Sequence, residues 1–156
     1  MLLILELTDY NDDNVIFYKS VKNNIIHNSN YSKMIYSSTL FTMNSIYIGF
    51  SLINYCKHIY NNKVRYTFHL LENNDIINKI KHIEEKLLQK YLNHNNNIIG
   101  KQSVYKISQQ LNNGNFRVIV DDINSNKQDN IKFLLKISGI WETATEYGAS
   151  FTFYAI

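Results

Sequence analysis

KISGIWETATEYGASFTFYAI, residues 136–156, contains the only Trp of the chain and two of its five Gly. Apolar and polar residues alternate from Ala149 to Ile156, and a similar alternation runs through Ile131–Trp141. A period of two is typical of half-buried strands. With Glu142–Gly148 as the connecting loop, these runs predict a C-terminal β-hairpin that completes the sheet or barrel of the fold.

Other strands are expected in runs rich in β-branched and aromatic residues, separated by Asn-rich loops. Lys63–Leu71 alternates most clearly, and its residues define two faces: Lys63, Arg65, Thr67 and His69 against Val64, Tyr66, Phe68 and Leu70. The other expected strands are Met1–Leu7, Val15–Val21, Leu40–Leu52 (with a bulge or bend at Gly49), Ser103–Leu111 and Phe116–Val120. The expected loops are Asn23–Asn30, Asn93–Asn97, Asn112–Asn115 with an Asn-Gly hairpin turn, and the polar segment Asp121–Asn130.

One segment has helical rather than strand spacing. From Asp75 to Leu92, apolar residues recur every three to four positions, and Asn73 or Asn74 can serve as the N-cap. The polar residues of this segment are expected on a solvated face: Lys79, Lys81, Glu84, Glu85 and Lys86. The helix is therefore expected to support the sheet and not to form a site.

The order of strands, one long helix and further strands predicts a mainly β, α+β protein. A small barrel with a helix between its third and fourth main strands, the OB-fold, has this order. Lys63–Leu71, Asp75–Leu92 and Ser103–Leu111 would then be the strand, helix and strand at that point, and an α+β sandwich with one covering helix is the alternative. Residues 1–156 are expected to form a single OB-like domain.

The composition limits the class of protein. No apolar stretch is long enough to span a membrane, and the single cysteine, Cys56, excludes an internal disulfide and agrees with a reducing, cytoplasmic compartment. The chain has 23 Asn, 22 Ile, 14 Lys and 12 Tyr, whereas it has 2 Arg and no Pro. This codon bias predicts an AT-rich genome. The net charge of +3 permits a polyanionic partner without requiring one.

The residue patterns of common enzymes are absent from the sequence. The five His are far apart, and with a single thiol the usual zinc sites are not expected. There is no Gly-rich phosphate-binding loop. The paired carboxylates Asp12-Asp13, Asp121-Asp122 and Glu84-Glu85 are adjacent in sequence, and adjacent side chains diverge in strands and helices. We therefore expect neither catalysis nor a metal or cofactor.

Aromatic and cationic residues interleave along the expected strands. Proteins that hold single-stranded nucleic acid stack bases on aromatic rings and bind phosphates with cations. The candidate nucleic-acid-binding residues are Tyr18, Lys19, Tyr47, Lys57, Tyr60, Lys63, Arg65, Tyr105, Lys106, Lys132, Lys136 and Trp141. The codon bias also brings Tyr and Lys together by chance, and a lone Trp is more often a core plug, here with Gly139 and Gly148 making room for it. Both interpretations stay open.

Two stretches carry a family pattern: LLKISGIWETATEYGASFTFYAI, of the form K-hydrophobic-x-G-I-W-E…Y-G-hydrophobic, and YTFHLLENNDIINKIKHIEEKLLQKYL. They cover 50 of the 156 residues and resemble small single-stranded-DNA-binding proteins of large cytoplasmic DNA viruses and of the linear plasmids of yeast cytoplasm. The resemblance implies an OB-type fold, cytoplasmic replication and self-association. Phe151–Ile156 contains no acidic residue, so recruitment of partners through an acidic tail, as in bacterial and phage proteins of this function, is not expected.

The expected function is therefore non-catalytic coating of single-stranded DNA during replication of an AT-rich viral or plasmid genome. The expected partners are single-stranded DNA, with RNA as the alternative, further copies of the chain in a homo-oligomer, and replication proteins, but no membrane. The alternative function is that of a structural or host-interaction protein of such an element, which binds protein instead of nucleic acid. A small nuclease is a third candidate.

Overall fold

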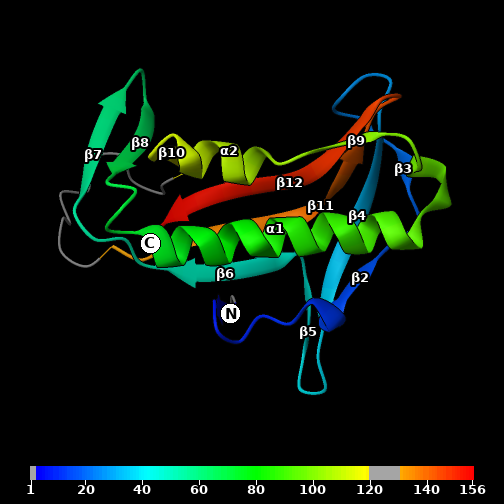
Figure 1. Cartoon of the computed structure of the whole chain (residues 1–156), viewed down its shortest axis with the longest axis horizontal. Helices are drawn as coiled ribbons and strands as arrows, with labels where there is room; N and C mark the ends of the chain where they lie inside the picture. The colour runs from blue at the N-terminus through cyan, green and yellow to red at the C-terminus, as the bar shows by residue number, and fades with distance from the viewer. Residues whose placement is uncertain (1–2, 120–130) are drawn as a thin grey trace.

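The computed structural model describes residues 3–119 and 131–156 and has the C-terminal hairpin at the centre of its sheet (Figure 1). Strands β11 (Phe133–Glu142) and β12 (Glu146–Ala155) pair antiparallel from end to end. The Thr143 N–H donates to the Glu146 carbonyl at 2.8 Å and closes the turn. The predicted hairpin is therefore confirmed, although Glu142 and Gly148 belong to the strands and not to the loop.

The main sheet is mixed, and its order is β1-β6-β11-β12-β10-β8-β7. The β1–β6 and β10–β12 pairs are parallel, and the other neighbours in this order are antiparallel. The bounds are β1 Leu5–Glu6, β6 Ile46–Phe50, β7 Tyr55–Tyr60, β8 Lys63–Phe68 and β10 Asn115–Ile119. The mainly β content predicted for the chain is confirmed, and the described strands form an open sheet in which β1 and β7 lie at opposite ends.

A second group of strands branches from β11. Strand β4 (Asn30–Ser37) pairs with Gly139–Glu142 of β11 and itself carries three short strands. These are β2 Val15–Phe17, β3 Val21–Lys22 and β5 Thr42–Asn44. The β4–β5 hairpin projects from the body of the molecule (Figure 1). On the other side of the sheet centre, β9 (Gln102–Val104) runs parallel to β12.

Helix α1 (Asn74–His94) confirms the predicted helix and lies across one face of the sheet (Figure 1). Its apolar residues at helical spacing are buried: Ile77, Ile80, Ile83, Leu87, Leu88 and Tyr91. Asn73 occupies the N-cap position, but its side chain bonds the loop after β6. Its Oδ1 accepts from the Ile53 N–H at 2.8 Å, and its Nδ2 donates to the Ile53 carbonyl at 3.0 Å. This buried amide ties the start of α1 to the sheet.

The core is built largely of aromatic rings from neighbouring strands. The ring of Phe116 lies 4.5 Å from that of Phe153 and 5.3 Å from that of Phe133, measured between centroids. Tyr66 lies 4.9 Å from Phe133 in an edge-to-face contact. Such pairs add to the stabilisation that burial of the rings already provides. The contacts join β8, β10, β11 and β12 into one packed unit.

The predicted strand Ser103–Leu111 is confirmed only for Ser103 and Val104, and the rest of the prediction is wrong. Strand β9 ends at Val104, and helix α2 (Lys106–Asn112) follows, with Ile107 and Leu111 buried one helical turn apart. The strand that follows α1 is therefore only three residues long, and a second helix lies between it and β10. The Asn-Gly turn is present, but Gly114, at φ +67°, connects α2 to β10 and not two strands of a hairpin.

Other predicted boundaries also change. Leu40–Leu52 is broken at Ser45, whose φ is +70°, and not at Gly49. Val15–Val21 divides into β2 and β3, while β4 and β7 lie in segments that were not predicted as strands. Two short 3-10 helices occupy Asp12–Asn14 and Asn96–Ile98. Met1, Leu2, Val120 and the predicted loop Asp121–Asn130, with its Asp121-Asp122 pair, lie outside the described residues.

Glu84 is buried, contrary to the predicted solvated face of the helix. Its side chain is 0% exposed, and it accepts the Ile107 N–H at 3.0 Å, the Ser108 N–H at 2.8 Å and the Ser108 hydroxyl at 2.6 Å. The first N–H groups of a helix have no partner within that helix. Burial raises the pKa of Glu84, and the hydrogen bonds from Ser108 and Ile107 oppose this rise without cancelling it. Glu84 of α1 thus caps the first turn of α2.

We expect Glu84→Ala to lower the free energy of unfolding by about 2–3 kcal/mol, because buried N–H groups of α2 lose their acceptor. Glu85→Ala is the matched control, since Glu85 is adjacent in sequence but exposed. It should change the free energy of unfolding by less than about 0.5 kcal/mol. Urea unfolding followed by circular dichroism measures both variants. Equal destabilisation by the two substitutions would contradict the capping role.

Candidate functional site

Strands β7, β8 and β10 place three basic side chains in one row across the sheet. Arg65 of β8 lies opposite His58 of β7 and opposite Arg117 of β10. Directly opposite residues of antiparallel strands share a face, with Cβ atoms about 5 Å apart. Arg65 and Arg117 are both exposed, and they are the only two arginines of the chain.

The alternation within β8 turns this row away from the aromatic core. Val64, Tyr66 and Phe68 are buried, whereas Lys63 and Arg65 are exposed. The predicted two faces of β8 are confirmed up to Phe68, where the strand ends and leaves Leu70 41% exposed. Lys63 adds a further cation opposite Tyr60. We refer to the exposed surface formed by His58, Lys63, Arg65 and Arg117 as the arginine face.

The arginine face has no neutralising partner within residues 3–119 and 131–156. None of the ion pairs there involves Arg65, Arg117 or Lys63, and none of the described residues that line the adjoining hollows is a carboxylate. Like charges directly opposite each other destabilise a sheet. The positive potential of this face would therefore be relieved by an anion.

Two hollows adjoin the arginine pair. The first has a volume of about 530 Å³ and is lined by His58, Tyr60, Lys63, Arg65, Thr67 and Arg117. The second, of about 490 Å³, lies between β10, β12 and α2, and its lining includes Gln110, Asn115, Ile119, Phe151 and the two arginines. The arginine pair is thus flanked by two concave surfaces, each large enough to receive part of a ligand.

Tyr60 is well placed to stack on a ligand, because its side chain is 77% exposed at the first hollow. His58 in the same hollow is hydrogen-bonded to Thr67, with 3.0 Å between Nε2 and Oγ1. Lys57 does not join this group. It lies opposite Tyr66 in the β7–β8 register and therefore on the core-facing side of the sheet.

Three other predicted binding residues lie on the same side of the sheet, nearer β1. Tyr47 of β6 and Lys136 of β11 are opposite each other, and the Lys136 Nζ lies 5.5 Å from the Tyr47 ring centre. Lys132 lies over Gly49 and is ion-paired with Glu6. The register connects them to the arginine face through Thr152, Tyr154 and Ile119. These residues extend the basic and aromatic surface across the sheet.

Four further predicted residues lie away from the arginine face. Tyr18 and Lys19 lie between β2 and β3, in the branch carried by β4. Tyr105 and Lys106 lie at the start of α2. None of the four lines either hollow.

Trp141 is buried and cannot serve as a platform for a base. Its side chain is 9% exposed, and its Nε1–H donates to the Ala149 carbonyl at 3.2 Å. The ring lies against Gly148, where a Cβ would come within 2.7 Å of it, and the Lys106 Nζ lies 4.6 Å from the ring centre. This burial favours the structural interpretation of Trp141 over a binding role, so Trp141 is not counted among the binding residues below.

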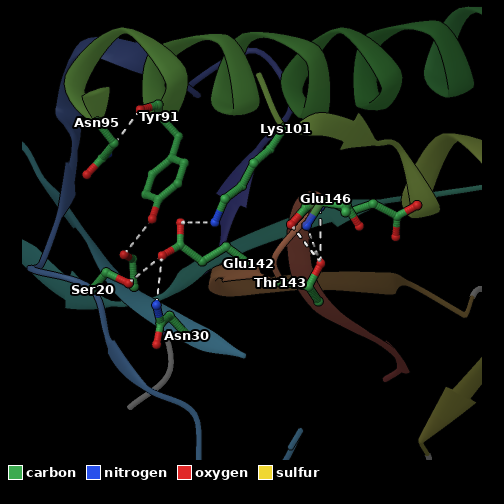
Figure 2. Close-up of polar contacts among 10 residues, drawn as sticks. Ser20, Asn30, Tyr91, Asn95, Lys101, Glu142, Thr143 and Glu146 are labelled. Carbon is green, nitrogen blue, oxygen red and sulfur yellow. Dashed lines mark hydrogen bonds and ion pairs between the residues drawn. The ribbon is translucent and has the colours of Figure 1, made fainter. Parts of the chain in front are cut away.

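A separate polar cluster surrounds Glu142 at the far end of β11 (Figure 2). This buried carboxylate accepts from the Ser20 hydroxyl at 3.0 Å and from the Asn30 amide at 3.2 Å, and the Lys101 Nζ lies 4.0 Å from its other oxygen. Nearby, the Tyr91 hydroxyl is hydrogen-bonded to Ser32 at 2.8 Å, and burial raises the pKa of Tyr91.

The Glu142 cluster holds segments together and offers little for chemistry. Both oxygens of its single carboxylate already have partners, and no group of three potential metal ligands occurs within residues 3–119 and 131–156. Its members come from the β2–β3 connection, β4, β11 and the residue before β9. The cluster therefore fixes the β4 branch to the centre of the sheet.

Sequence reasoning alone does not single out Arg117 and His58. Arg117 lies between Phe116 and Val118 in β10, and both of these neighbours are buried. This alternation is a signal that Arg117 lies on an exposed face. That this face is shared with Arg65 depends on the pairing of β8 with β10, which are separated in sequence by α1, β9 and α2.

No known protein family matches the chain, and no curated protein or solved structure shows significant similarity to it. Among the helices of the described ranges, none is both long and apolar enough to cross a membrane. The arginine face and its two hollows are therefore the basis for assigning a function.

Replacing either arginine should leave the fold intact. Arg65→Ala and Arg117→Ala each remove a like-charge contact, so the melting temperature should stay the same or rise slightly. Phe116→Ala is the control, because Phe116 neighbours Arg117 in β10 but is buried. It should lower the free energy of unfolding by about 3–5 kcal/mol. If either arginine variant melted as early as Phe116→Ala in a thermal scan, the face assignment would be wrong.

Proposed function

We propose that this protein binds single-stranded nucleic acid through its arginine face, with DNA as the leading candidate and RNA as the alternative. The observation that carries the proposal is the pairing of Arg65 with Arg117, two exposed guanidinium groups opposite each other without a carboxylate among the described residues around them. A guanidinium binds two phosphate oxygens through parallel N–H groups. A phosphate would therefore offset the repulsion within the pair. The proposed activity is binding without catalysis.

The aromatic and apolar side chains beside the arginines favour a single strand over a duplex. Tyr60 lines the first hollow, and Phe151 lines the second. Unpaired bases can stack on such rings, which contributes about 1–3 kcal/mol per base. The bases of a duplex stack on each other and leave mainly phosphates for the protein to contact. Tyr47 and Lys136, on the same side of the sheet, would extend the path of a longer strand.

We assign this binding to the coating of single strands during replication of an AT-rich viral or plasmid genome, in the cytoplasm. The abundance of Asn, Ile, Lys and Tyr supports an AT-rich source. An OB-type barrel stays a prediction for this chain. Binding on the arginine face does not require a closed barrel, because the face is formed by three neighbouring strands of the open sheet.

A protein-binding role is the second candidate, and an exposed apolar patch favours it. Leu71 is 93% exposed, and with Leu70 it lines a hollow of about 590 Å³. Ile53, whose backbone is hydrogen-bonded to Asn73, is also exposed. Exposed apolar patches mark contact surfaces for proteins. This patch would serve a structural or host-interaction protein that has no nucleic-acid ligand.

Binding of labelled oligo(dT), measured by fluorescence anisotropy, tests the first proposal. We expect Arg65→Ala and Arg117→Ala each to weaken binding several-fold, because each removes hydrogen bonds to a phosphate. In a plot of the logarithm of the binding constant against the logarithm of the salt concentration, the slope of each variant should also be shallower. The expected change is about 0.7 for every phosphate that the variant no longer binds. Lys86→Ala is the control, since it removes the same charge from an exposed position on α1 and should leave the affinity nearly unchanged.

Three results would count against nucleic-acid binding at this face. One is the absence of oligo(dT) binding at low salt, and another is binding that does not depend on salt. The third is a double variant, Arg65→Ala with Arg117→Ala, that binds as tightly as the wild-type protein. A duplex of the same length should bind more weakly than the single strand, and equal affinity would contradict the stacking role of Tyr60 and Phe151.

Self-association is expected if the protein coats a strand. A single OB-type module contacts about 4–16 nucleotides, so covering a long strand requires an array of copies. We expect light scattering to detect a dimer or larger species, and binding to long oligo(dT) to be cooperative. A protein that is monomeric at every concentration and binds without cooperativity would contradict the coating role while leaving single-strand binding in place.

A further inference from the structure

Arg65 and Arg117 lie between the two hollows and belong to both. Each of these side chains lines the hollow of about 530 Å³ and the hollow of about 490 Å³. The two residues are in register on β8 and β10, which places their Cβ atoms about 5 Å apart on one face. Two guanidinium groups on such closely spaced stems can bind the two non-bridging oxygens of one phosphate. The arrangement therefore fits a single phosphate better than two separate ones.

The two hollows present different surroundings on either side of that phosphate. The first contains the exposed ring of Tyr60, together with His58. The second combines apolar groups, of which Phe151 is aromatic, with the side-chain amides of Gln110 and Asn115. A ring can stack on an unpaired base, and an amide can exchange hydrogen bonds with the edge of a base. Each hollow thus has groups suited to a nucleoside, but the two are not equivalent.

We propose that the arginine pair seats one internucleotide phosphodiester, with the two flanking nucleosides in the two hollows. A dinucleotide step is then the unit that the arginine face binds. This inference rests on the proposed function and specifies how a single strand is placed on the face. A phosphate bound in this way also explains why both positions are arginine. Lysine would supply the charge without the planar group that binds two oxygens.

The presence of only two arginines allows a direct test by NMR. Protein labelled with nitrogen-15 arginine gives one side-chain Nε–Hε signal from each, assigned with Arg65→Lys and Arg117→Lys. The probes are oligo(dT), the dinucleotide dTpdT, its uncharged methylphosphonate-linked analogue, thymidine monophosphate and inorganic phosphate. We expect dTpdT to shift both signals with the same dissociation constant, several-fold lower than those of thymidine monophosphate and inorganic phosphate. The uncharged analogue should shift neither signal, and either Lys variant should bind dTpdT more weakly.

The outcomes distinguish the phosphate seat from the proposed function. If oligo(dT) binds but shifts only one arginine signal, or neither, the seat is wrong while single-strand binding stands. If oligo(dT) does not bind, both are wrong. If inorganic phosphate binds as tightly as dTpdT, the hollows contribute nothing and the dinucleotide unit is overturned. Binding of the methylphosphonate analogue as tight as that of dTpdT would show that the phosphate charge is not recognised.

Discussion

Strand β11 is hydrogen-bonded along both of its edges, and the positions of the other strands in the sheet depend on this pairing. Most of its residues are buried, and buried backbone N–H and C=O groups require partners. Strand β12 occupies one edge, while the other is divided between β6, opposite Phe133–Ile137, and β4, opposite Gly139–Glu142. The bulge between Ile137 and Gly139 lies where the partner changes. A side chain at Gly139 would collide with Tyr31 and with the Ser32 carbonyl, so the close approach of β4 requires glycine there.

The outer edge of β12 is divided in the same way, and this division creates the second hollow. Strand β9 pairs with Glu146–Gly148, β10 pairs with Phe153 and Tyr154, and α2 connects the two strands. A helix of seven residues is marginal by itself, so the cap that Glu84 supplies from α1 stabilises it where local sequence cannot. The last turn of α2 contributes Gln110 to the hollow beside the arginines. A buried carboxylate on the long helix therefore helps to shape a surface that we assign to ligand binding.

The sequence predicts those elements whose stabilising contacts are periodic or local. Helix α1, the two faces of β8 and the C-terminal hairpin belong to this group. Helix α2 is not predicted, because its cap comes from another helix. Glu84 is charged and is therefore expected on the solvated face, although it lies four residues from both Ile80 and Leu88. At the site, alternation was enough to place Lys63 and Arg65 on the outer face. It could not show that Arg117 is the neighbour of Arg65, because that depends on which strands pair. The alternation of residues also could not show that Trp141 is buried, with its ring packed against Gly148 and the Lys106 ammonium above it.

The placement of the two arginines is the strongest reason to regard this surface as a ligand site. Positive charge is available to this chain from 14 lysines, yet both arginines occupy one cross-strand pair. Among residues 3–119 and 131–156 no carboxylate pairs with either arginine, and their like charges repel each other across a short distance. A lysine ammonium would carry the same charge, but it lacks the planar group that binds two phosphate oxygens at once. The arrangement is therefore better explained by an anion that both arginines bind than by the stability of the sheet. It is the geometry of these two guanidinium groups, more than the net charge of +3, that favours a phosphate ligand.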